Sequence, residues 1–156
     1  ALDQKSDPLR PCIMWNDQRS FAECEEMTSI VGKEEILRIT GNPVLAGFTA
    51  PKILWLQKNE PDIFAKIDKI ILPKDFIRYK LTGEFFTDVS DASGMSLLNV
   101  GERTWSNQII DQLGWKKEWF AEVTESTEVT SRISSIGAEA TGLVAGTPVV
   151  AGGGDC

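Results

Sequence analysis

An aspartate follows three glycines near the carboxyl-terminal end of the chain, directly after a short apolar segment. The order Val149-Val150-Ala151, Gly152-Gly153-Gly154, Asp155 predicts a buried strand, a turn that a ligand can approach closely, and a carboxylate beyond the strand end. Open α/β sheets bind their ligands at this position. A carboxylate there could take a proton from a substrate hydroxyl, the general-base task in phosphoryl transfer. The same residues are also common in surface turns, so this pattern alone leaves both interpretations open.

Trp15 ends a second apolar segment, residues 10–15, which is predicted to be a strand. Its indole face could stack on the C–H face of a polyol, although a tryptophan in such a pattern is more often part of the core. Asp17 and Arg19 follow in a turn and could bind hydroxyls. An ion pair between them on the surface is the more common arrangement.

Asp88 and Asp91 lie at a loop rich in serine and glycine, residues 90–94, and could ligate a cation. Two carboxylates without a fixed cage are weak grounds for a metal site, and Asp91 is better explained as a loop or capping residue. We therefore predict no metal site in this chain. No phosphate-binding loop of the Walker type occurs, and the three glycines lack the spacing of a dinucleotide-binding fingerprint.

The composition excludes several classes of function. The 156 residues contain 16 Lys and Arg, 23 Asp and Glu and no histidine, so the formal net charge is −7. Without histidine, the chain cannot by itself complete a Ser-His, Cys-His or histidine-ligated metal mechanism. The acidic balance argues against binding to nucleic acid or to an anionic membrane surface.

The cysteines and the hydropathy pattern favour a cytoplasmic protein. Cys12, Cys24 and Cys156 are odd in number and widely spaced, which argues against a disulfide framework or a zinc site. No apolar run approaches the roughly 18 residues that a membrane helix needs, and no basic-then-apolar leader opens the chain.

The elements that must position these residues are predicted to be short helices and strands, a mixed α/β pattern. A capping box of Ser20 and Glu23 begins one helix, and Gly83 ends another whose inward face is formed by apolar residues from Phe76 to Leu81. Helices are predicted at 21–31, 34–40, from Thr49 onward, at 74–82 and at 105–113; strands at 10–15, 69–73 and 85–89; loops at 90–94 and 124–130; and short strands or turns at 133–145.

Both ends of the chain look cut. The chain begins with Ala1 in a polar, turn-like segment, and it stops directly after the glycine turn and its aspartate. A domain that ended there would have a glycine turn with no following element for the turn to connect. We therefore expect an internal fragment of a longer protein.

Five motifs, taken in order along the chain, resemble the FGGY family of carbohydrate kinases. The first-signature segment, residues 47–59, matches position by position, and the resemblance spans about residues 10–156. Within the family it is closest to the bacterial xylulokinases. The segments that carry the resemblance are residues 11–19, 47–59, 72–84, 90–95 and 149–155.

The resemblance implies a ribonuclease H-like α/β fold of the actin, hexokinase and heat-shock ATPase superfamily. Residues 1–156 would be the later part of the N-terminal, sugar-binding domain, without the start of that domain and without the C-terminal ATP-binding domain. Asp155 would be the catalytic base and would contact the sugar, and Trp15 would bind the substrate. ATP and Mg²⁺ would be bound mainly by regions outside this chain, so the isolated chain is predicted to be inactive.

The same resemblance implies D-xylulose and ATP as substrates and D-xylulose 5-phosphate as product. Two departures argue against glycerol: Gly47 stands where glycerol kinases place a substrate-contacting tyrosine, and Cys156 where they place glutamine. Another ketose, a polyol or a sugar acid stays open as substrate, as does a non-catalytic sugar-binding module. The sequence also leaves the oligomeric state open, a homodimer included.

Overall fold

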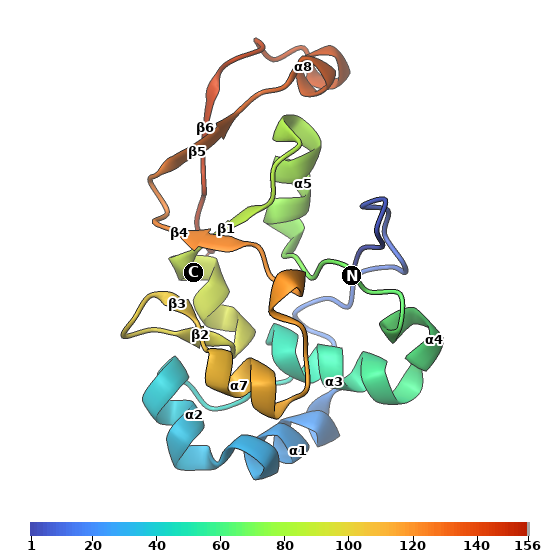
Figure 1. The fold of residues 1–156 in the computed structure, drawn as a ribbon, viewed down its shortest axis with the longest axis vertical. Helices are drawn as coiled ribbons and strands as arrows, with labels where there is room; N and C mark the ends of the chain where they lie inside the picture. Colours follow the sequence, from blue (N-terminus) through green and yellow to red (C-terminus); the bar gives the residue numbers. More distant parts are fainter. Residues whose placement is uncertain (156) are drawn as a thin grey trace.

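The computed structural model describes residues 1–155, which form short helices and strands in an elongated molecule (Figure 1). Six of the elements are strands, all of two to four residues. In chain order the elements are α1 (Phe21–Val31), α2 (Lys33–Thr40), α3 (Thr49–Asn59), α4 (Pro61–Phe64), α5 (Pro73–Thr82), β1 (Phe86–Asp88), α6 (Val89–Ala92), η1 (Ser93–Met95), β2 (Leu98–Asn99), β3 (Thr104–Trp105), α7 (Asn107–Gln112), η2 (Lys117–Trp119), β4 (Glu122–Thr124), β5 (Val129–Arg132), α8 (Ser135–Thr141) and β6 (Pro148–Val150).

The described strands pair into three separate two-stranded sheets. β1 lies parallel to β4, with Thr87 opposite Val123, whereas β2–β3 and β5–β6 are antiparallel. Parallel strands need a crossover connection, and the chain between β1 and β4 supplies one that contains α6, β2, β3 and α7. The β1–β4 pair therefore joins the helical half of the molecule to the upper half in Figure 1.

The main hydrophobic core lies in the lower half of Figure 1, between α1, α2, α3 and α7. α3 contributes buried side chains from more than one of its sides, as its apolar sequence predicted. Burial of large apolar side chains is the principal favourable term in folding, so these helices form the stable base of the molecule. The largest fully buried apolar side chains here are Met27, Ile36, Ile39, Ile53, Met95, Leu97, Ile109 and Ile110.

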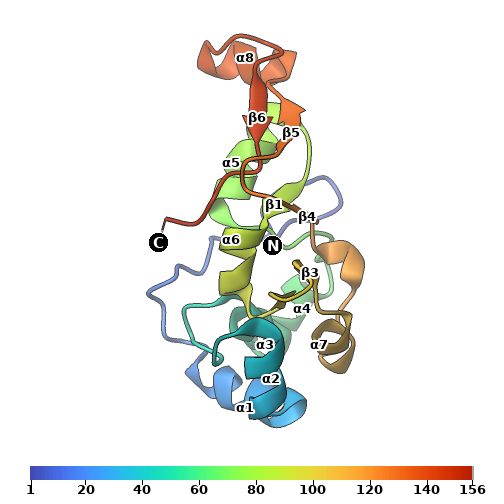
Figure 2. The same ribbon diagram turned by 90° about the vertical axis from the view of Figure 1, so that its left-hand side faces the viewer.

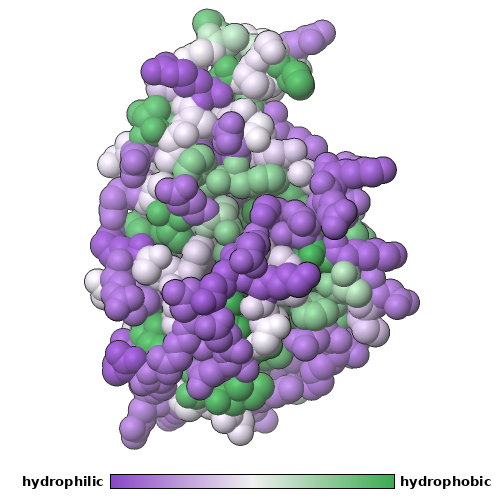
Figure 3. Space-filling model, viewed as in Figure 1, coloured by the Kyte–Doolittle hydropathy of each residue, from purple (hydrophilic) through white to green (hydrophobic). Residues whose placement is uncertain are grey.

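β5, α8 and β6 form an arm that projects from the other end of the molecule (Figure 2). α8 packs on the end of α5 at Gly137, where an added Cβ would collide with the backbone of Leu81. The apolar side chains of the arm stay largely in solvent: Ile136 on α8 is 76% exposed, and Val144 after α8 is 75% exposed. The viewed face in Figure 3 accordingly shows green patches on this arm, between hydrophilic side chains.

The helices with clear stop residues are confirmed. α1 ends at Gly32, α2 at Gly41 and α5 at Gly83, and all three glycines adopt positive φ. The predicted capping box at α1 is wrong in its side chains: the Ser20 hydroxyl donates to the carbonyl oxygen of Ala46 at 3.3 Å and makes no cap hydrogen bond. A tertiary partner has replaced the local one.

Two predicted strands are wrong. Residues 10–15 lie outside helices and strands, and residues 69–73 take part only in single bridges, from Lys69 to Leu2 and from Ile70 to Phe120. The apolar pattern was present in both segments, but a strand also needs a neighbour that pairs along its length. Within residues 1–155, neither segment has such a neighbour.

Several other predictions need correction. Residues 90–94 form α6 and part of η1 rather than a loop, the segment 133–145 contains the helix α8, and Trp105 belongs to β3 and precedes α7. β6 forms as predicted but is not buried: Val150 is 44% exposed and only the following Ala151 is buried. The helices that end at Gly32, Gly41 and Gly83 were identified correctly, whereas the short capped helices α6 and α8 were missed. Burial and strand pairing depended on contacts distant in sequence.

The predicted inward face of α5 is also wrong. Its buried residues are Asp75, Arg78 and Thr82, while Ile77 is 60% exposed. Buried polar groups need hydrogen-bond or charge partners, and Arg78 finds them in the carbonyl oxygen of Val150 at 3.2 Å and in the hydroxyls of Thr130 and Ser131. α5 therefore directs its polar side toward the segment that ends in Asp155.

Candidate active site

Asp155 lies at the end of the segment that leaves β6 (Figure 2), and its residue is exposed. The backbone turns at Gly152, whose φ of +101° lies in the region that favours glycine. The Gly152 amide donates to the carbonyl oxygen of Ser126 at 3.1 Å, which fixes the start of the turn. The glycine turn that the sequence predicted is therefore present, and it leads to the exposed residue Asp155.

The same segment is attached to α6 at a second point. The Gly154 amide donates to the hydroxyl oxygen of Ser90 at 3.3 Å, and an added Cβ on Gly154 would lie 3.7 Å from Cα of Asp91. Burial raises the pKa of Asp91, and the neighbouring carboxylates, Asp155 among them, raise it further. Asp155 is thus close enough to α6 for its charge to act on Asp91.

Asp88 organises the start of α6. Its side chain is fully buried and accepts hydrogen bonds from the Ser90 amide at 2.9 Å, the Asp91 amide at 3.4 Å and the Ser126 hydroxyl at 2.7 Å. Asp88 is therefore the N-cap of this helix. The sequence placed the capping role on Asp91 instead, which lies inside α6.

Lys74 carries the positive charge in this cluster. Its Nζ lies 2.6 Å from Oδ1 of Asp75, 2.9 Å from Oδ1 of Asp88 and 3.8 Å from Oδ2 of Asp91. Burial opposes the charged form of Lys74, but its hydrogen bonds to Asp75 and Asp88 outweigh burial and raise its pKa. Lys74 lies in the segment 72–84, which carries part of the family resemblance, but the sequence indicated no role for it.

The carboxylates of the cluster respond differently to Lys74. Burial raises the pKa of Asp75, and the contact with Lys74 only partly offsets this. For Asp88, burial is opposed by the hydrogen bonds from Lys74 and Ser126, which hold its pKa below the ordinary value. The cation that Asp88 and Asp91 face is therefore a lysine ammonium. Residues 1–155 contain no group of three or more His, Cys, Asp or Glu side chains placed to hold a metal ion.

Trp15 lies on the surface, with 75% of the residue exposed, so the interpretation as a core tryptophan is wrong. It precedes a turn in which the Asp17 amide donates to the carbonyl oxygen of Met14 at 3.1 Å. Arg19 pairs with Asp17 at 2.8 Å, the predicted surface ion pair. An added Cβ on Gly47 would lie 2.9 Å from the carbonyl oxygen of Trp15, so glycine is required at position 47 in this arrangement.

The structure places Trp15 and Asp155 on different segments, the loop before α1 and the end of the chain. Both segments lie on the left-hand side of Figure 2, which is the far side in Figure 1. Both Trp15 and Asp155 are exposed residues. The roles of the two residues stay predictions.

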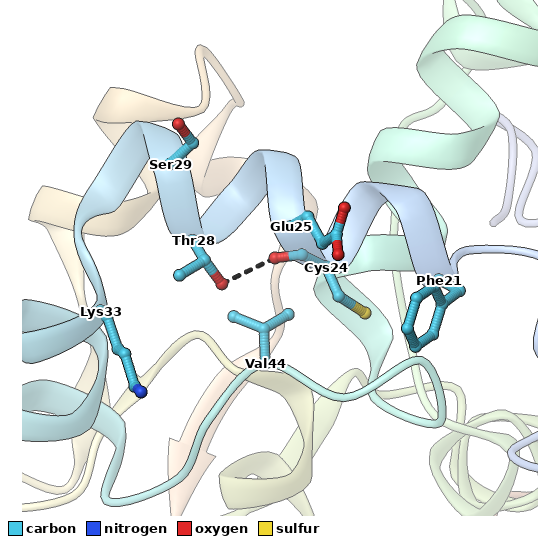
Figure 4. A pocket seen from close by; sticks show the side chains of 7 residues that line it. All are labelled: Phe21, Cys24, Glu25, Thr28, Ser29, Lys33 and Val44. Carbon is cyan, nitrogen blue, oxygen red and sulfur yellow. Dashed lines mark hydrogen bonds between the residues drawn. The ribbon is translucent and has the colours of Figure 1, made fainter.

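A pocket lined by residues of α1 lies elsewhere. Its volume is about 470 Å³, and α1 and the residues after it line it on the side shown in Figure 4. The Thr28 hydroxyl donates a hydrogen bond to the carbonyl oxygen of Cys24 at 2.7 Å. The side chains of Phe21 and Val44 face the pocket. The pocket has no carboxylate cluster and lies at the opposite end of the molecule from β6, so we do not assign the chemistry to it.

Within residues 1–155 the thiols are free, Cys12 exposed and Cys24 buried, and Cys156 lies outside the described residues. No helix in the same range has the length and apolar character that crossing a bilayer requires.

Comparisons with known proteins agree with the motifs. The model of the FGGY family of carbohydrate kinases, N-terminal domain, matches residues 1–156. The xylulose kinase of Escherichia coli (strain K12) is 44% identical over 154 residues, 99% of this chain and 31% of that protein. The chain thus spans about a third of the length of the curated relatives it matches.

Solved structures show the same fold. A "xyloylose kinase" from Brucella ovis superposes with a TM-score of 0.91 at 41% identity, covering 99% of this chain and 31% of that one. The gluconate kinase of Lactobacillus acidophilus gives a TM-score of 0.88 at 27% identity over 97% of this chain and 31% of that one. The predicted α/β class is therefore confirmed as the actin/hexokinase-like ATPase fold, present as part of a domain. The chain belongs to the FGGY family of carbohydrate kinases.

Proposed function

We propose that the protein that carries this chain is an ATP-dependent kinase that converts D-xylulose and ATP to D-xylulose 5-phosphate and ADP. The observation that carries the proposal is the exposed carboxylate of Asp155, on a glycine segment held at both ends by serines. The 44% identity to the xylulose kinase of Escherichia coli supports D-xylulose as the sugar. In this proposal residues 1–156 are the later part of the sugar-binding domain.

Asp155 is the general base of the proposed reaction. Its carboxylate accepts the proton of the sugar hydroxyl while that oxygen attacks the γ-phosphorus of ATP in line. The new O–P bond forms as the bond from the γ-phosphorus to the bridging oxygen of ADP breaks. The three glycines before Asp155 carry no side chains, so a sugar can approach this carboxylate closely.

Mg²⁺ and most of the ATP contacts belong, in this proposal, to parts of the protein outside this chain. Magnesium bound to ATP neutralises phosphate charge during transfer. Among the described residues, no three ligating side chains are grouped to hold Mg²⁺. The two carboxylate oxygens of Asp88 are engaged by the Lys74 ammonium and by hydrogen-bond donors such as the Ser126 hydroxyl. The contribution of this chain is therefore to bind the sugar and to accept its proton.

Trp15 is proposed to bind the sugar. Its exposed indole can cover the C–H face of a ketose, and the close contact of Gly47 with the Trp15 backbone leaves no room for the tyrosine side chain of glycerol kinases. We expect Trp15→Ala to raise the KM for D-xylulose about tenfold and to change kcat less than about threefold, because stacking stabilises ground state and transition state alike. Steady-state kinetics on the full-length protein measure this. An unchanged KM would remove Trp15 from the sugar site, and Trp55→Ala is the control for loss of a tryptophan on a neighbouring helix.

A panel of acceptors tests the proposed substrate. The full-length protein is assayed for ADP release with D-xylulose, D-ribulose, glycerol, xylitol and gluconate, and the product is identified by ³¹P NMR. We expect kcat/KM for D-xylulose to exceed every other value by at least about 100-fold, because an acceptor that lacks a recognised hydroxyl leaves polar groups of the site unpaired. A preference for gluconate would favour the sugar-acid alternative, which the fold of the Lactobacillus acidophilus gluconate kinase supports. Binding without transfer to any acceptor would indicate a non-catalytic module.

The proposed reaction takes place in the cytoplasm, between a free sugar and ATP. The exposed thiol of Cys12 fits a reducing compartment. The net charge of −7 disfavours nucleic acid as a partner.

A further inference from the structure

The glycine segment before Asp155 has two attachments, and both depend on the same carboxylate. Ser126 accepts from the Gly152 amide through its carbonyl oxygen, and Ser90 accepts from the Gly154 amide through its hydroxyl oxygen. Asp88 binds both serines, the Ser126 hydroxyl at 2.7 Å and the Ser90 amide at 2.9 Å. Asp88 therefore holds the two anchors in fixed positions relative to each other.

Asp88 can do this as a buried anion only because Lys74 neutralises it. The Asp88 side chain is fully buried, and a carboxylate without a partner at such a depth is strongly disfavoured. Nζ of Lys74 lies 2.9 Å from Oδ1 of Asp88, the oxygen that accepts no hydrogen bond from the serines. The ammonium and the serine anchors thus occupy opposite oxygens of one carboxylate.

Lys74 also contacts the segment directly. An added Cβ on Gly152 would lie 3.6 Å from Cδ and 3.9 Å from Nζ of Lys74. The lysine stem therefore lies against the turn at Gly152, on the path from β6 to Asp155. The aliphatic stem of Lys74 packs against the turn at Gly152, and its ammonium group lies beside the same turn.

We propose that Lys74 is the positioning residue for Asp155: it fixes the Asp88 anchors and the glycine turn so that the Asp155 carboxylate meets the sugar hydroxyl. This inference depends on the proposed role of Asp155 as the base. In this scheme Lys74 acts through Asp88 and through the turn at Gly152. Nothing in the charge or spacing of the sequence around Lys74 indicated this role.

The test is Lys74→Met in the full-length kinase. We expect kcat for D-xylulose to fall about 10- to 100-fold, the size of effect that small misplacement of a reacting group produces, with KM for D-xylulose within about twofold. Lys74→Arg keeps the charge and should restore most of kcat. The matched control is Lys80→Met, an exposed lysine on the same helix α5, which should leave kcat and KM unchanged.

Each outcome decides the inference. A folded Lys74→Met enzyme with normal kcat would overturn the inference, and so would a low kcat that Lys74→Arg does not rescue. If Lys74→Met does not fold, Lys74→Met/Asp88→Asn removes both buried charges together and should fold with kcat at least about tenfold low. Normal kcat in that double variant, or failure of both variants to fold, would make Lys74 a residue of stability alone.

The Asp155→Asn enzyme separates this inference from the proposed function. If the parent enzyme transfers phosphate and Asp155→Asn does not, a normal Lys74→Met enzyme overturns only the positioning role. If the parent enzyme phosphorylates no sugar, the proposed function is wrong and the positioning role is overturned with it.

Discussion

Replacing Asp155 with asparagine in the full-length kinase is expected to lower kcat for D-xylulose about 10²- to 10⁴-fold, the usual contribution of a general base. Asparagine fills the same space but cannot accept the hydroxyl proton. The loop that carries residue 155 is held by backbone amides at Gly152 and Gly154, so the substitution leaves its attachments in place. KM for the sugar, or its affinity by calorimetry, should change less than about threefold, because the interaction lost is one made in the transition state.

The control for Asp155→Asn is Asp62→Asn, which makes the same change at an exposed aspartate in the first turn of α4. Its kcat and KM should equal those of the parent enzyme. Turnover of the Asp155→Asn enzyme within about tenfold of the parent would contradict the assignment of the base. A loss of sugar affinity equal to the loss in kcat would instead make Asp155 a binding residue.

The 156-residue chain on its own is expected to show no sugar-dependent consumption of ATP. In the proposed mechanism this chain supplies the base and part of the sugar site, while positioning of ATP requires the rest of the protein. The chain spans 31% of the length of the Escherichia coli relative.

The measurement is ADP release by the isolated chain with and without D-xylulose, against an equal molar amount of the full-length kinase. Circular dichroism of the same sample shows whether the helices have formed. A D-xylulose-dependent rate above about 10⁻⁴ of the full-length rate would contradict the proposed division of labour, because losing the positioning of one reactant alone costs several orders of magnitude. The Asp155→Asn chain, at the same concentration, identifies any contaminating kinase.

Local sequence determined the helices that end at glycines 32, 41 and 83, the glycine turn and the family, but it did not reveal α6 or α8. Gly32, Gly41 and Gly83 end α1, α2 and α5 because glycine adopts positive φ without steric cost, which is a property of the residue itself. The order of motifs identified the FGGY family, and the family model matches the whole chain. The sequence also identified Asp155 as the candidate base, because its position after three glycines at a strand end is readable from the chain alone.

Tertiary structure alone decided which sides of these elements are buried and which polar residues meet. Lys74 and Asp75 are adjacent in sequence, but Asp88 and Asp91 reach Lys74 only because β1 and α6 fold back along α5. The same contacts turned the polar side of α5 inward, against an apolar pattern that predicted the opposite. Buried charges are stabilised by partners distant in sequence, and helical periodicity carries no information about those partners. For this reason the residue proposed to position Asp155 became visible only in the folded chain.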